Sequence, residues 1–193
     1  PHNLQVYSND FSNAAWGKTE VSVVSDAIVG PDGVTLADKI EETAATNLHT
    51  VVDSVTTTGP NTIAVWMKAA ERSVGYFRVD FASCWFDLSS GTVLTNALGD
   101  ASITDAGNGW YLCKVETTDE SYNLRIGPTT ADGVVSYAGT LGSGIYVADA
   151  HVYHSDLGGM ANNPDTGTSY VPTTDSAVYL PRRNHSVYNG TDW

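Results

Sequence analysis

The sequence predicts an all-β fold, an antiparallel β-sandwich of the jelly-roll type. Short segments of alternating apolar and polar residues recur along the chain, and clusters of Gly, Pro, Asn and Asp separate them. Blocks of Glu, Lys, Leu and Ala that would build long amphipathic helices are scarce. Strands at this spacing are typical of sandwiches and barrels, and 193 residues are enough for one domain with a sizeable core.

The expected strands follow one another at short intervals. Six lie in the first half of the chain: Leu4–Tyr7, Thr19–Ser25, Val34–Glu41, Leu48–Val55, Thr62–Ala69 and Gly75–Phe81. Val34–Glu41 also fits a short helix, because its periodicity is ambiguous. Four more are Cys84–Leu88, Trp110–Glu116, Tyr122–Ile126 and Ile145–Tyr153. Turn signals such as Pro31-Asp32-Gly33 and Gly59-Pro60-Asn61 separate them.

We expect one jelly-roll domain over residues 1–175. The composition changes after Tyr153, and residues 176–193 are expected to be a C-terminal linker that leads into a truncated hairpin. The Asn189-Gly190 pair would form the turn of that hairpin.

The charge balance excludes some classes of partner. Nine basic and 22 acidic residues give a net charge of -13, which disfavours nucleic acid and anionic membrane surfaces. The sequence has no apolar run long enough to span a membrane. The chain's two cysteines make no disulfide framework or zinc motif, and Cys113 is expected to be a buried free thiol.

Five segments resemble, in order, a carbohydrate-binding-module-like jelly-roll domain found in phage tail, tail-fibre and other virion proteins. The segments are Asn3–Lys18, Ala27–Ile40, Thr62–Ala69, Gly107–Cys113 and Ser169–Thr173. The resemblance implies a virion location, in a tail or fibre, or otherwise an extracellular or cell-surface one. It implies a glycan on a host surface, or other virion subunits, as partners, and no enzymatic activity. This chain has His151-Val152-Tyr153 where the family usually carries Gln-Leu-Glu.

A candidate sugar-binding floor follows from strand parity. In Thr62–Ala69, three apolar side chains share one face, so Trp66 and Lys68 face the other way. The same reasoning predicts that six residues line one concave sheet face: Trp66, Lys68, Arg78, Asp80, Asn123 and Arg125. An aromatic ring among charged and amide groups is typical of a site for a glycan, including an acidic one. The alternative is that Trp66 packs under a loop and the charges are ordinary surface residues.

The resemblance also implies one structural Ca²⁺ between the first and last strands. Its expected ligands are Asn9, Asp10 and Asp149, with backbone carbonyls completing the oxygen shell. Asp149 lies in an otherwise apolar strand, where a lone carboxylate is costly unless it is paired or metal-bound. The alternative is an Asp at a strand edge that faces water.

Two other functions stay open. One is a purely structural role in virion or tail assembly, which would use an exposed apolar patch. The other is a polysaccharide lyase in which His151 and Tyr153 share a strand face and Arg78 or Lys68 neutralises a uronate.

Overall fold

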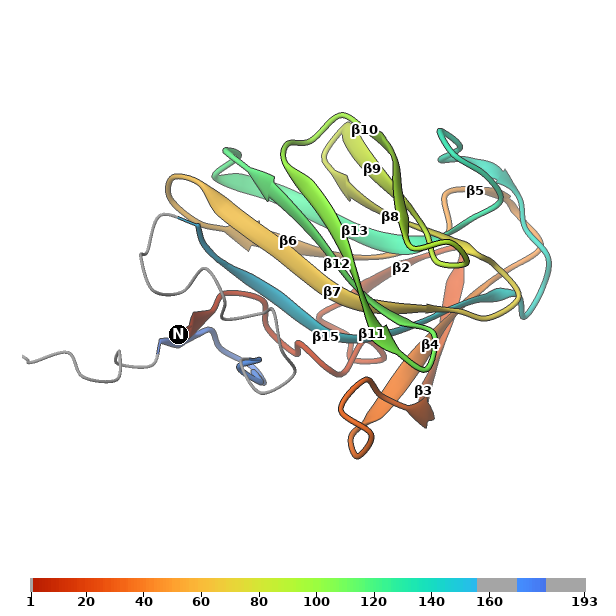
Figure 1. Cartoon of the computed structure of the whole chain (residues 1–193), viewed down its shortest axis with the longest axis horizontal. Helices are drawn as coiled ribbons and strands as arrows, with labels where there is room; N and C mark the ends of the chain where they lie inside the picture. The colour runs from red at the N-terminus through yellow and green to blue at the C-terminus, as the bar shows by residue number, and fades with distance from the viewer. Residues whose placement is uncertain (1, 156–169, 180–193) are drawn as a thin grey trace, which may run out of the picture.

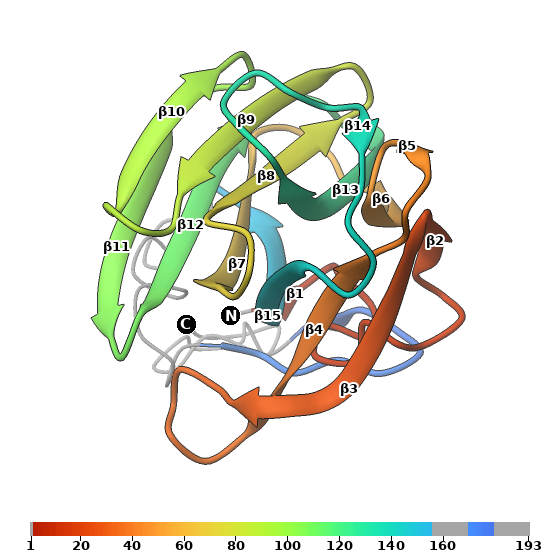
Figure 2. The ribbon, with the colours of Figure 1, turned by 90° about the vertical axis from the view of Figure 1, so that its right-hand side faces the viewer.

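The computed structural model describes residues 2–155 and 170–179 (Figure 1). Twelve strands in this part of the chain form two six-stranded antiparallel sheets that enclose one core (Figure 2). The predicted all-β sandwich is therefore confirmed. Among the described residues, no helix has the length and apolarity to cross a membrane.

Sheet I and sheet II each combine strands from distant parts of the chain. Sheet I has the spatial order β10 (Thr92–Asn96), β9 (Ala82–Asp87), β8 (Val74–Val79), β13 (Ser121–Thr129), β6 (Thr50–Thr56), β2 (Gly17–Thr19). Sheet II has the order β11 (Ala101–Gly107), β12 (Trp110–Thr117), β7 (Asn61–Ala69), β15 (Gly144–His154), β4 (Leu36–Glu42), β3 (Val21–Val29). Consecutive strands β7 and β8 thus belong to opposite sheets.

Two short strand pairs complete the described fold. The pair of β5 (Thr46–Asn47) and β14 (Tyr137–Ala138) lies at one end of the sandwich (Figure 2). The other pairs β1 (His2–Asn3) with β16 (Val178–Tyr179). The β16 strand lies within the stretch expected to be a linker, whereas residues 180–193, including the expected truncated hairpin, lie outside the described residues.

The core is built from the inward-facing positions that alternation predicts. Ile63, Val65 and Met67 of β7 are fully buried between the sheets. Trp16 is also fully buried, and its indole nitrogen donates to the carbonyl of Tyr7 at 3.0 Å. Cys113 is a buried free thiol, as predicted.

Some strand boundaries differ from the predicted ones. Residues 4–7 are irregular, because side chains take up part of their backbone hydrogen bonding; the amide of Gln5, for example, donates to Asn3 Oδ1 at 3.0 Å. The ambiguous segment Val34–Glu41 corresponds to strand β4. Strand β8 ends at Val79, two residues before the expected end. Strands β10 and β11 were not predicted, because many of their residues are polar or exposed.

Candidate ligand-binding face

The six residues of the predicted sugar-binding floor do not share one face. Trp66 and Lys68 lie on β7 in sheet II, whereas Arg78 lies on β8, and Asn123 and Arg125 on β13, in sheet I. Within each strand, alternation predicted correctly which side chains face outward. The prediction of one common floor is wrong, because β7 pairs with β12 and β15 and not with β8.

Trp66 offers no open ring for a sugar. It faces outward from sheet II, but only 6% of its surface is exposed. It belongs to a second apolar cluster on this outer face with Trp110 and Leu112, against which Ile28 packs. The Trp110 indole donates to the carbonyl of Val29 at 3.3 Å, so the β3–β4 hairpin covers this cluster. This is the alternative in which Trp66 packs under a loop.

Sheet I presents two arginines side by side on its outer face. Arg78 and Arg125 are directly opposed across β8 and β13, and both are half-buried. Arg78 Nη1 donates to Ser83 Oγ at 3.4 Å. Arg125 Nη1 donates to the hydroxyls of Thr19 and Thr50 at 3.2 and 3.4 Å. All of these hydrogen-bond partners are neutral hydroxyls.

The turn between β8 and β9 displays an aromatic ring beside these arginines. Asp80 has a left-handed backbone with φ of 49°, so the chain reverses after Val79. Phe81, the last residue of the expected strand Gly75–Phe81, lies beyond the end of β8 and is 90% exposed. The Arg78 guanidinium lies 6.0 Å from the centre of the Phe81 ring, within the range of a cation–π contact.

Asn123 is held in a fixed orientation next to this turn. Its Oδ1 accepts from Ser54 Oγ at 3.1 Å, and its backbone amide donates to Asp80 Oδ1 at 3.1 Å. Asp80 and Asn123 border an open depression of about 370 Å³, which Ser54 and Tyr122 also line. Phe81, Arg78, Asp80 and Asn123 therefore form a candidate ligand-binding face, to which parity reasoning assigned every residue except Phe81.

Tyr76 lies two residues before Arg78 on β8, on the same face of sheet I. It is fully buried and stacked on Trp85, with ring centres 6.1 Å apart. Its hydroxyl has no hydrogen-bond partner in the described structure. Burial raises the pKa of Tyr76 to about 12, although the charges of Arg78 and Arg125 act in the opposite direction.

The outer face of sheet II carries the residues of the lyase hypothesis. The rings of His151 and Tyr153 are 5.1 Å apart on β15. Arg78 lies on the opposite sheet, and Lys68 pairs with Tyr146, farther along β15. The predicted convergence with either residue is therefore absent.

A different lysine lies across β7 from this pair. Lys114 is paired with Ala64, which is also the partner of His151. Together with Tyr153, it lines a pocket of about 170 Å³.

Two of the three residues suggested as calcium ligands are in contact. Asn9 Oδ1 accepts a hydrogen bond from the backbone amide of Asp149 at 3.1 Å. Asp149 is 7% exposed at an irregularity in the β15 register, and burial raises its pKa to about 7. The Asp10 carboxylate instead accepts from Ser12 and Asn13 within its own turn. No cluster of three or more His, Cys, Asp or Glu side chains suited to a metal occurs in the described ranges.

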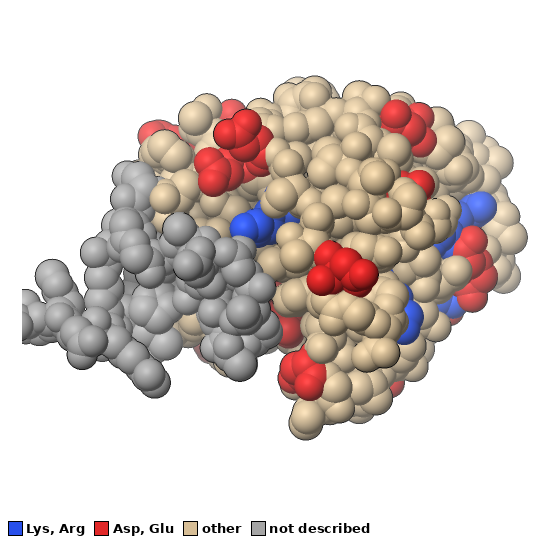
Figure 3. Space-filling model, in the orientation of Figure 1, with Lys and Arg blue, Asp and Glu red and all other residues tan. Residues whose placement is uncertain are grey.

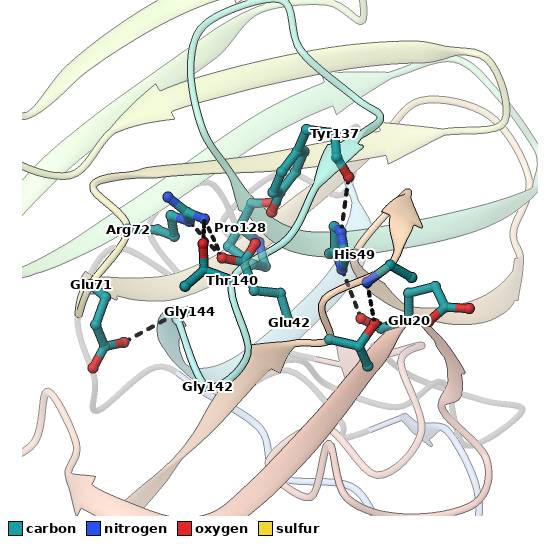
Figure 4. A network of polar contacts seen from close by, with 12 residues as sticks. Glu20, Glu42, His49, Glu71, Arg72, Pro128, Tyr137, Thr140, Gly142 and Gly144 are labelled. Carbon is teal, nitrogen blue, oxygen red and sulfur yellow. Dashed lines mark hydrogen bonds and ion pairs between the residues drawn. The ribbon is translucent and has the colours of Figure 1, made fainter.

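A buried charged network occupies the end of the sandwich near β5 and β14 (Figure 4). The Glu42 side chain is fully buried and accepts from Arg72, with Nε at 2.8 Å. The Arg72 guanidinium also lies 5.7 Å from the centre of the Tyr137 ring, and His49 packs against the same ring at 4.6 Å. Sequence reasoning did not identify this network, because its members come from distant segments with no shared motif.

The surface charge agrees with an acidic chain that has local basic positions. On the face in Figure 3, acidic side chains form separate groups and basic ones are few. No extended basic stripe is visible on this face.

Comparison with known proteins yields a distant likeness to solved structures. No protein-family model matches the chain, and no curated protein matches it. A solved structure described as the enzymatically active domain of bacteriophage CBA120 tailspike protein 4 aligns with a TM-score of 0.41 and 10% identity. The alignment covers 78% of this chain and 21% of the tailspike chain, so this chain spans about a fifth of that protein's length.

These comparisons change two expectations. The carbohydrate-binding-module-like family is not confirmed, since no family model matches. The expectation that the chain is not an enzyme is corrected, because the similar structure is described as enzymatically active. That description belongs to the tailspike protein, and a likeness at this level assigns no activity to this chain.

Proposed function

We propose that this chain is a glycan-binding domain of a phage tail or fibre protein, and that the face formed by Phe81, Arg78, Asp80 and Asn123 binds the glycan. The virion setting rests on the five sequence segments that resemble phage tail domains. The choice of face rests on Phe81, whose ring is 90% exposed beside fixed polar groups.

The chemistry of this face fits a sugar ring. An exposed aromatic ring can pack against the apolar face of a pyranose, while neighbouring polar groups bind its hydroxyls. Asn123 and Asp80 orient each other, and the Asp80 carboxylate accepts from Asn123 only through Oδ1. Its Oδ2 atom is therefore available to a sugar hydroxyl.

A glycan array screened with the whole chain and with Phe81→Ala tests this proposal. We expect a defined set of glycans to bind the original chain, and at least tenfold weaker binding by the variant. Trp66→Phe is the matched control, because it alters a covered aromatic residue on the other sheet and should leave binding unchanged. If no glycan binds, or if Phe81→Ala binds as well as the original chain, the proposal is refuted.

The failure of glycan binding would favour a structural role in the virion. The exposed apolar residues near the tip of the β3–β4 hairpin would then be the first candidates for an assembly contact. They are Val29, Val34 and Leu36, exposed by 48%, 82% and 43% respectively.

Polysaccharide cleavage is a second candidate function, supported by the position of Tyr153. Its ring is 5.1 Å from that of His151, and it lines the same pocket as Lys114. In a β-elimination, one member of the His151/Tyr153 pair would remove the proton next to the uronate carboxylate. The other would protonate the departing glycosidic oxygen, which leaves an unsaturated sugar. Lys114 would neutralise the carboxylate.

Incubation with alginate, polygalacturonate and hyaluronan tests this second function. A lyase would increase the ultraviolet absorbance of the unsaturated product, and Tyr153→Phe would abolish that increase. No increase with any of the three polymers, or an unchanged rate in Tyr153→Phe, would refute cleavage at this site.

A further inference from the structure

The geometry of sheet I points to a more specific ligand. We propose that Arg78 and Arg125 form a subsite for the carboxylate of an acidic sugar, such as a uronic or sialic acid. This inference rests on the proposed glycan-binding function and names the class of glycan.

The two arginines form an uncompensated pair of like charges. They are directly opposed across β8 and β13, a position at which like charges destabilise a sheet. Neither belongs to any of the ion pairs in the described structure, which join Lys39 and Arg72 to glutamates. A bound anion between them would remove this repulsion.

Most of the hydrogen-bonding capacity of the pair is unused. Each guanidinium carries five N–H donors. Within the described residues, Arg78 donates one side-chain hydrogen bond, to Ser83, and Arg125 donates from Nη1 alone, to Thr19 and Thr50. A carboxylate is the group that a guanidinium binds with two parallel hydrogen bonds.

A buried hydroxyl lies on the same strand as Arg78, because Tyr76 is two residues away on β8. Tyr76 is fully buried, and its hydroxyl lacks a hydrogen-bond partner among the described residues. Leaving a buried hydroxyl unpaired is unfavourable, so such groups need an explanation.

The position of Phe81 connects the carboxylate with a sugar ring. The Arg78 guanidinium lies 6.0 Å from the centre of the Phe81 ring. A sugar that stacks on Phe81 would therefore hold a ring carboxylate within reach of Arg78. The net charge of -13 would repel an anion from most other parts of the surface, so these local charges decide whether an acidic glycan binds.

Matched pairs of glycans that differ only in charge test the subsite. Suitable pairs are sialyllactose with lactose, and oligogalacturonate with its carboxyl-reduced form. We expect the chain to bind the acidic member of at least one pair at least tenfold more tightly than the neutral member. Arg78→Gln and Arg125→Gln should each reduce that ratio towards one.

The matched control is Lys68→Gln, which removes one positive charge from the opposite sheet. It should leave the ratio unchanged, because the Lys68 ammonium donates to the carbonyl of Asn108 on the far side of the molecule. Arg125→Gln should also keep or raise the melting temperature, since it removes a like-charge repulsion. A purely structural role of Arg125 would instead lower the melting temperature.

The outcomes separate the subsite from the wider function. Equal binding of acidic and neutral members, with loss of both in Phe81→Ala, would overturn the subsite and leave the glycan-binding proposal standing. The same loss of acidic preference in Lys68→Gln as in the arginine variants would also overturn it. No binding to any pair, together with a negative array, would refute both proposals.

Discussion

Substitution of Arg72 by Met is expected to destabilise the fold strongly. The Glu42 side chain is fully buried, and Arg72 donates to one of its carboxylate oxygens from both Nε and Nη2 (Figure 4). Arg72→Met would leave an uncompensated charge inside the protein, which costs about 3–5 kcal/mol. For a chain of this size, the melting temperature should fall by roughly 6–20 °C.

Two comparison variants show whether the buried charge is the cause. Replacing both Glu42 and Arg72 by Met removes the pair without leaving a lone charge, so it should cost less than Arg72→Met alone. Glu71→Gln affects an ion pair whose carboxylate side chain is 53% exposed, so it should cost less than about 1 kcal/mol.

Urea unfolding followed by tryptophan fluorescence measures these differences. The tryptophans Trp16 and Trp110 report the transition because both are buried. A loss below about 1 kcal/mol for Arg72→Met would refute the reasoning. The stability lost in the double variant is also compared with the losses in Arg72→Met and Glu42→Met. If it equals the sum of those two losses, the two side chains are not coupled.

Three further predictions follow from buried groups. Burial raises the pKa of Asp149 to about 7, above its ordinary value of 3.8. In EDTA, the contribution of Asp149 to the free energy of unfolding should therefore be complete below about pH 4, and it should fall as the pH rises to 7. Asp149→Asn should abolish this fall in urea titrations between pH 4 and pH 8, and an unchanged fall would contradict the assignment. Burial raises the pKa of Cys84 to about 12, and Cys113 is fully buried, so a thiol reagent at pH 8 should label neither cysteine before unfolding and both after it. Rapid labelling of the folded chain, measured by mass spectrometry, would show that the core opens. Gly127→Ala should lower the melting temperature, because the added methyl would lie 2.0 Å from the carbonyl oxygen of His49, and an unchanged temperature would show that this strand can shift.

Much of the fold could be predicted because alternation reports directly on burial. Ile63, Val65 and Met67 repeat every second residue, and all three lie in the core. Polar or exposed strands such as β10 and β11 give no such signal, since tertiary pairing and not local sequence makes them strands. The irregular segment around Leu4 shows the opposite case, in which apolar alternation occurs without a strand because side chains bind the backbone.

The candidate site was harder to predict because parity identifies a face but not a sheet. The outward direction of Trp66 follows from its own strand, whereas its separation from Arg78 depends on pairing between residues far apart in sequence. The register of β7 with β12 and β15 is a long-range property, and the chain carries no motif that specifies it.

Phe81 shows how one backbone angle relocates a side chain. Counting in steps of two from Phe77 and Val79 assigns Phe81 to the core, and that count holds only while the strand continues. At Asp80 the backbone turns left-handed, a conformation that Asp tolerates better than most residues, and the alternation ends there. In this chain, Asp80 therefore marks the hairpin tip between β8 and β9. Because the Phe81 ring is 90% exposed at this turn, its replacement should have little effect on the packing of the core.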